Sequence, residues 1–131
     1  MRYLTAEGIL ILHALVVDET GGSHGVRETE LLQSIAHKPQ SQFGEKDLYP
    51  DIFTKAAVLL EAIANYHVFV DGNKRTSFIA TARFLSLNGF EVTMSNHDVE
   101  EKVLAVATKH MNLEQIAAWL KKNSKKIRRN K

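Results

Sequence analysis

The sequence contains no cysteine and only two prolines, and it has no long hydrophobic run. Without cysteine, neither a disulfide nor a thiolate metal site can form, and such a chain is compatible with a reducing cytosol. The apolar runs are far too short to span a bilayer, and no basic and apolar leader opens the chain. We therefore expect a cytoplasmic protein. With 131 residues, 44% of them hydrophobic, the chain is long enough to build one core.

The net charge of +2 hides an uneven distribution. Residues 121–131 hold seven of the seventeen Lys and Arg residues and no acid, so the remainder carries ten basic against fifteen acidic residues, a formal charge of −5. A nucleic-acid-binding domain would instead spread its basic residues over a folded face. We expect a helical domain over residues 1–122 and a basic, disordered tail over residues 123–131. A loose contact of this tail with RNA or an acidic partner is the alternative.

Apolar residues recur at helical spacing along most of the chain. A first helix is expected after the cap residue Thr5, with Ile9, Leu12, Leu15 and Val16 on one buried face. Further helices are expected over about residues 28–37, after Asp51, over about residues 73–88, after Ser95 and after Asn112.

The apolar residues that follow Asp51 nearly encircle a helix, which predicts that this helix lies at the centre of the fold. Pro39 and Pro50 bracket a loop that allows a small hairpin around Phe43 and Gly44. The sequence therefore predicts an all-α fold, a compact bundle of five or six helices with a short hairpin or loop.

Residues 67–75 carry the clearest chemical signal of the chain. They contain the imidazole of His67, the carboxylate of Asp71, a glycine turn, and two cations, Lys74 and Arg75, at the start of a helix. The first turn of a helix is electropositive, so each cation there costs about 0.3–1 kcal/mol unless an anion neutralises it. Free N–H groups after Gly72 would add to an anion cradle. A polyphosphate is the obvious ligand.

Each residue of this segment also has a simpler interpretation. His67 is suited to accept a proton near neutral pH, but it could equally end a helix. Asp71 could bind Mg²⁺ or simply begin a turn before Gly72. Asn73 can cap the helix or contact a phosphate, and Phe69 is expected to anchor the loop inward. The remaining histidines show no metal-ligand spacing and receive no role; they are His13, His24, His37, His97 and His110.

The pattern His67-x-Phe69-x-Asp71-Gly72-Asn73-Lys74-Arg75-Thr76 resembles the signature of the Fic/Doc family, and specifically its death-on-curing branch. The resemblance extends over most of the chain, including residues 3–5, 25–28, 38–40, 48–50, 84–85 and 88–89. It implies a small helical fold and an ATP-dependent transfer to a protein hydroxyl.

The same resemblance implies a role for each residue of the pattern. His67 would take the proton from the attacking hydroxyl, and Asp71 would hold Mg²⁺. Phe69 would be the structural anchor of the loop. The phosphates of ATP would be cradled by Gly72, Asn73, Lys74 and Arg75. The loop between the two prolines would correspond to the family's flap, which aligns the target segment.

One departure from the wider family concerns the reaction. Adenylylating members usually carry Gly-Asn-Gly-Arg, whereas Lys74 replaces the second glycine here. Toxins of this branch share the lysine but have Ala where this chain has Gly72. The resemblance to them implies that ATP binds in the reversed orientation and that its terminal phosphoryl group is transferred. We therefore expect a toxin kinase that modifies a Ser or Thr of a cytosolic protein, with elongation factor Tu as target. AMP transfer is the alternative within the same site, and a catalytically inactive helical partner-binding module is the alternative of another class.

The resemblance also bears on how the activity of such a protein is inhibited. Many Fic proteins carry their own inhibitory helix, and its motif is not found in this sequence. We therefore expect a separate antitoxin whose helix covers an apolar groove on the bundle.

Overall fold

A computed structural model describes residues 1–128 of the chain. In this part of the chain the structure contains six α-helices, which confirms the predicted helical bundle. They are α1 (Ala6–Thr20), α2 (Thr29–His37), α3 (Ile52–Asn65), α4 (Asn73–Leu87), α5 (Asn96–Ala107) and α6 (Leu113–Lys122). A short 3-10 helix, η1 (Lys38–Gln40), and four short strands complete it: β1 (Gln42–Phe43), β2 (Lys46–Asp47), β3 (Phe90–Val92) and β4 (Ser124–Lys126).

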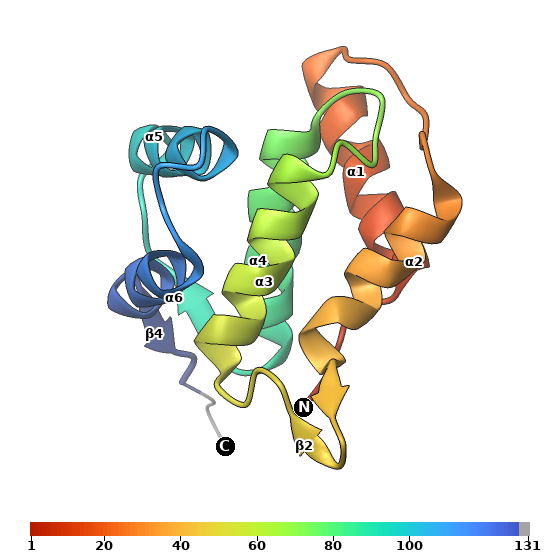
Figure 1. Ribbon diagram of the computed structural model, residues 1–131. Helices are drawn as coiled ribbons and strands as arrows, with labels where there is room; N and C mark the ends of the chain where they lie inside the picture. The colour runs from red at the N-terminus through yellow and green to blue at the C-terminus, as the bar shows by residue number, and fades with distance from the viewer. Residues whose placement is uncertain (129–131) are drawn as a thin grey trace.

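The helices surround a central pair. Helices α3 and α4 pack side by side in the middle of the bundle, with α1 and α2 on one side and α5 and α6 on the other (Figure 1). No helix in the described residues is long and apolar enough to cross a membrane.

Side-chain caps set four helix starts where the sequence predicts them. The side chain of Thr5 accepts a hydrogen bond from the Gly8 amide, and that of Asp51 accepts from the Phe53 and Thr54 amides. Ser95 caps α5, and Asn112 forms a capping box with Gln115 at the start of α6. Since such a cap typically contributes about 0.5–2 kcal/mol, these local signals fix where the helices begin.

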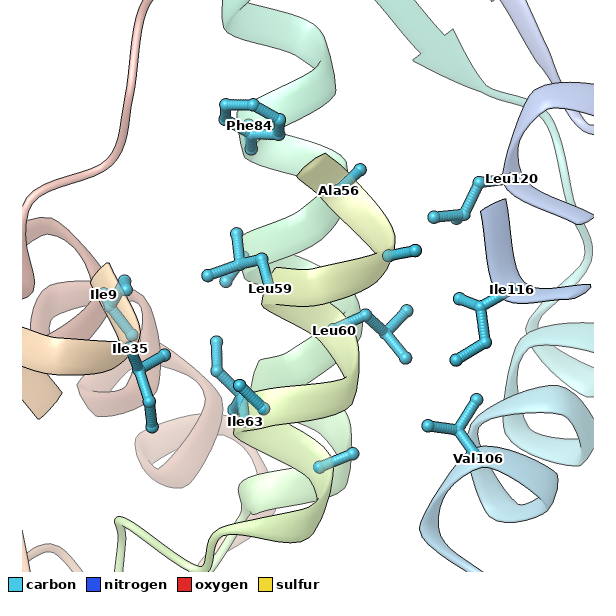
Figure 2. Close-up of a cluster of buried hydrophobic side chains, with 14 of the residues drawn as sticks. Ile9, Ile35, Ala56, Leu59, Leu60, Ile63, Phe84, Val106, Ile116 and Leu120 are labelled. Atoms are coloured by element: carbon cyan, nitrogen blue, oxygen red, sulfur yellow. The ribbon is translucent and has the colours of Figure 1, made fainter. Parts of the chain in front are cut away.

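Helix α3 is the centre of the core, as its apolar pattern predicts. Ten of its fourteen residues are buried, so it contacts neighbours on nearly every side. Figure 2 shows Leu59 on the side of Ile9 and Ile35, and Leu60 on the side of Ile116. The hydrophobic packing of α3 therefore holds the two halves of the bundle together.

The predicted buried face of α1 is right for Ile9 and Val16 and wrong for Leu15, which is 60% exposed. A helix turns by about 100° per residue, so Leu15 lies roughly 120° around the helix from Ile9. The buried face of α1 is instead completed by His13 and Val17.

The C-terminal segment is more ordered than its composition predicts. Ser124–Lys126 form β4, which pairs antiparallel with β3, and the Ile127 amide donates a hydrogen bond to the Gly89 carbonyl at 2.9 Å. The expectation of disorder from residue 123 is therefore wrong for this strand, because backbone pairing does not need apolar side chains. The last part of the predicted tail, residues 129–131, lies outside the described residues.

The hairpin expected between the two prolines is present, since β1 pairs antiparallel with β2. It lies before the first turn of α3, where Lys55 donates to the Pro39 carbonyl at 3.0 Å and to Asp47 Oδ2 at 3.3 Å. His67 follows the other end of α3, and a helix of 14 residues spans roughly 21 Å. The hairpin and His67 therefore adjoin opposite ends of α3, although Lys38, just before the hairpin, donates to the Tyr66 hydroxyl at 2.6 Å. The expected role of the hairpin as a flap that aligns the target segment stays a prediction.

Candidate active site

The segment that joins α3 to α4, residues 67–72, is called the signature loop below. Its middle is buried, because Val68 and Phe69 are both 0% exposed. A short antiparallel bridge holds it from the other side: the Arg27 amide donates to the Val68 carbonyl at 2.8 Å, and the Val70 amide donates to the Gly25 carbonyl at 3.1 Å. The loop is therefore fixed at both ends by core helices and in the middle by packing and backbone pairing.

His67 stands at the start of this loop with an exposed side chain. Its φ of 51° lies in the left-handed region, which a non-glycine residue rarely adopts. Such a conformation typically costs about 1–3 kcal/mol and persists only where the surrounding structure enforces it. Here the buried residues that follow His67 enforce it, and they leave the imidazole accessible to a substrate.

The carboxylate of Asp71 is exposed but already oriented by backbone amides. Oδ1 accepts a hydrogen bond from the Gly72 amide at 2.9 Å, and Oδ2 accepts from the Ser23 amide at 3.2 Å. Ser23 belongs to residues 21–25, which we call the glycine loop. A Cβ at Gly22 would lie only 2.7 Å from Asp71 Oδ2, so any side chain there would displace the carboxylate from its present position. This contact was not predicted from the sequence, in which the adjacent glycines of the glycine loop are its only signal.

Gly72 and Asn73 form the turn into α4. Gly72 has φ 75° and ψ 17°, a left-handed conformation that suits glycine. The side-chain amide of Asn73 is occupied by the backbone of Phe69: its oxygen accepts from the Phe69 amide at 3.0 Å, and its nitrogen donates to the Phe69 carbonyl at 2.9 Å. Asn73 can therefore face a ligand with its backbone N–H, while its side chain holds the loop closed.

The start of α4 is electropositive. Within residues 1–128, no side chain caps this helix, and its first turn has no acidic residue. Lys74 and Arg75 are exposed, so their charges add to the uncapped N–H groups of the first turn. This arrangement attracts an anion.

A groove of about 550 Å³ opens beside these two cations. Helices α1, α4 and α5 form its walls, and apolar side chains dominate the lining, including Phe78, Ile79 and Leu104. Ile79 and Leu104 are 38% and 53% exposed. The anion-attracting end of α4 is therefore continuous with an apolar surface.

One buried histidine also contacts the signature loop. His13, in α1, is 1% exposed, and its Nε2 lies 2.7 Å from the Asp71 carbonyl oxygen. His13 has no predicted role, because no local pattern relates two residues that lie 58 positions apart. Only its place one turn after the buried Ile9 could have indicated an inward position.

The fold and the loop are those of a small helical protein in which a buried loop joins an exposed histidine to an anion-attracting helix start. Residues 3–85 match the Fic/DOC family, and the chain belongs to that family. It is 37% identical over 122 residues to Toxin Doc of Mycolicibacterium smegmatis (strain ATCC 700084 / mc(2)155), covering 91% of each chain. It is 26% identical over 122 residues to Protein kinase doc of Escherichia phage P1, covering 93% of this chain and 95% of the relative.

Proposed function

We propose that this protein is the toxin of a toxin–antitoxin pair and transfers a phosphoryl group from ATP to a Ser or Thr hydroxyl of a cytosolic protein, with elongation factor Tu as target. The observation that carries the proposal is the uncapped start of α4 with its exposed Lys74 and Arg75, which ends the signature loop that begins at the exposed His67. The names of the two relatives, a Doc toxin and a Doc protein kinase, support the same function.

In the proposed reaction, His67 takes the proton of the attacking hydroxyl as its oxygen forms a bond to the terminal phosphorus of ATP. The bond between that phosphorus and the bridging oxygen breaks, and ADP leaves. The backbone N–H groups after Gly72 and the charges of Lys74 and Arg75 stabilise the phosphate oxygens. Because phosphoryl transfer depends mainly on positioning and charge stabilisation, these groups supply the main contribution of the protein.

Asp71 fits a role in holding Mg²⁺. Each of its carboxylate oxygens accepts one backbone hydrogen bond and retains a lone pair for a metal. Across the described residues, no three His, Cys, Asp or Glu side chains gather as metal ligands. Mg²⁺ is the ion that suits such a site, because it typically takes one or two carboxylates and completes its shell with water and substrate phosphates. When bound, it would neutralise negative charge on the phosphates.

The position of Lys74 favours phosphate over AMP as the group transferred. A long cation at this point occupies space that a glycine would leave to a triphosphate, so the nucleotide must lie differently. The alternative, AMP transfer, is favoured by Gly72, which the adenylylating pattern also contains. Incubating the protein with ATP, Mg²⁺ and purified elongation factor Tu, and then weighing the factor by mass spectrometry, separates the two. A mass increase of one AMP would refute the kinase assignment.

A catalytically inactive partner-binding module makes a different prediction. If His67 is the base, His67→Ala should abolish the growth arrest caused by expressing the protein, whereas His97→Ala should not. His97 is a suitable control because its side chain is 86% exposed and lies on α5. If H67A and the parent arrest growth equally, catalysis through this imidazole is wrong.

The proposed antitoxin has a surface to which it can bind. The groove between α1, α4 and α5 is mainly apolar, and it exposes Ile79 and Leu104. Its charged lining residues are Glu19, Lys74, Arg75 and Glu100. An amphipathic helix could bury these side chains and cover Lys74 and Arg75 at the same time. Ile79→Glu should therefore prevent co-purification with the antitoxin, whereas Leu48→Glu, at a 52% exposed position before α3, should not. Equal co-purification of both variants would place the antitoxin elsewhere.

A further inference from the structure

His13, a buried residue of α1, makes two contacts with the signature loop. Its ring stacks on Phe69, with ring centroids 3.8 Å apart and an interplanar angle of 6°. Its Nε2 lies 2.7 Å from the Asp71 carbonyl oxygen. Both partners belong to the loop, whereas His13 belongs to a rigid helix 15 residues long. One side chain of α1 thus touches both the anchor of the loop and the backbone of the candidate metal ligand.

The hydrogen bond defines the state of the imidazole at this nitrogen. A carbonyl oxygen can only accept, so Nε2 of His13 must carry a hydrogen and donate it. The acceptor belongs to the peptide unit that joins Asp71 to Gly72. Holding that oxygen fixes the plane of the peptide on which the left-handed turn at Gly72 depends.

The turn also rests directly on the surface of α1. A Cβ built at Gly72 would lie 3.5 Å from Val17 Cγ2 and 3.7 Å from His13 Nε2, so an added side chain here would contact both residues of α1. On its other side, Asp71 is held through its carboxylate by the Ser23 amide. The backbone and the side chain of Asp71 are therefore restrained from two different directions.

These contacts have a consequence for the geometry of the site. Along the chain, the Asp71 carboxylate precedes the Gly72 turn and the first N–H groups of α4 follow it. Any rotation of the Asp71–Gly72 peptide would move the carboxylate relative to the cations at the start of α4. We infer that His13 is a positioning residue of the active site, which holds the Asp71 carboxylate at the spacing from α4 that a metal-bound polyphosphate requires. This inference rests on the proposed function, because it assigns a role toward Mg²⁺ and ATP.

A histidine that merely fills space in the core makes a different prediction. In that case any side chain of similar size and ring shape would serve, and the hydrogen-bond donor would be dispensable. Phenylalanine retains a planar ring for stacking on Phe69 but has no donor. Glutamine has no ring, but its side-chain amide can donate to the Asp71 carbonyl. The two substitutions therefore separate the hydrogen bond from the stacking.

The test compares His13→Phe with His13→Gln, and it uses Ile9→Val as a control. Ile9 is fully buried one turn earlier in the same helix, and it belongs to the hydrophobic core. ATP is titrated into each protein by calorimetry over a series of MgCl₂ concentrations, and thermal unfolding is recorded in parallel. We expect the affinity for Mg²⁺ in the presence of ATP to fall by about 10- to 100-fold in H13F, the usual effect of losing a residue that orients a metal ligand. H13Q should recover most of this loss, and I9V should bind as the parent does.

A second measurement does not depend on nucleotide binding. Amide hydrogen exchange at Gly72 and Asn73 should be faster in H13F than in the parent, and it should be restored toward the parent rate in H13Q. If H13F does not fold, His13→Met replaces it, because Met has a flexible side chain of adequate size and no donor.

The outcomes distinguish the inference from the proposed function. If the parent binds Mg²⁺ and ATP, and H13F binds them equally well, His13 is not a positioning residue. The same conclusion follows if H13Q is impaired as much as H13F, since restoring the hydrogen-bond donor would then recover nothing. If the parent does not bind Mg²⁺ and ATP, the proposed function fails. The amide exchange rates then decide whether His13 holds the turn, and unchanged rates in H13F would refute that role.

Discussion

Replacing Gly22 by alanine should damage the candidate site while leaving the fold almost as stable as before. A Cβ at this position would lie 2.7 Å from Asp71 Oδ2. To reach an ordinary separation of about 3.5 Å, the carboxylate or the glycine loop must move by roughly 0.8 Å. Such a shift breaks the hydrogen bond from the Ser23 amide and misplaces the candidate Mg²⁺ ligand.

The expected magnitudes differ for stability and for function. The lost hydrogen bond removes about 0.5–1.5 kcal/mol, and the less flexible unfolded chain of an alanine variant returns about 0.4–1 kcal/mol, so the net change in stability is small. In contrast, a misplacement of about 1 Å in an active site can lower the rate by roughly 100-fold. The free energy of unfolding is measured in urea, and function is measured by binding of ATP with MgCl₂ and by growth arrest.

Gly44→Ala is the matched control. Gly44 has a left-handed φ of 65°, and a Cβ there would meet no atom within 4 Å. The substitution therefore introduces strain of roughly 1–2 kcal/mol, partly offset in the unfolded chain, without touching the site. It should lower stability and preserve binding, the opposite of the result expected for G22A. If G22A binds Mg²⁺ and ATP as tightly as the parent, the close contact with Asp71 does not matter and the reasoning fails.

Three further predictions follow from the same structure. Lys74→Ala and Arg75→Ala should each raise thermal stability slightly, by about 0.3–1 kcal/mol, because each removes a cation from the electropositive start of a helix. Calorimetry should show that both variants lose ATP binding, and a loss of stability would contradict this prediction. Leu59→Ala should destabilise the fold by about 2–5 kcal/mol in urea, because Leu59 is 1% exposed in the core. Hydrogen bonding from Gln42, and then from Lys55, lowers the pKa of Asp47. The ionised carboxylate therefore stabilises the hairpin above its ordinary pKa, and this contribution is lost as the pH falls through the lowered pKa. An NMR titration should show a smaller lowering of the Asp47 pKa in the Gln42→Ala variant.

The helix starts were predictable because their signals are local. A cap such as Thr5 or Asp51 and the apolar spacing after it lie within a few residues, and the structure confirms both. Leu15 shows the limit of that reasoning: the apolar stripe of α1 is broad, and only the packing of the bundle decided which side faces inward. The strand β4 shows another limit, because its basic composition gives no indication of its backbone pairing with β3.

The amino-acid sequence by itself determined the chemistry that residues 67–75 offer, because their base, carboxylate, glycine and cations are consecutive and the helix start between them is a local feature. Tertiary structure alone decided how these groups are held. His13 and the glycine loop reach Asp71 across 58 and 48 positions of the chain, and they meet it only because α1 packs against the turn into α4. Local patterns constrain neighbours along the chain, whereas contacts of this range follow from the burial of the whole core.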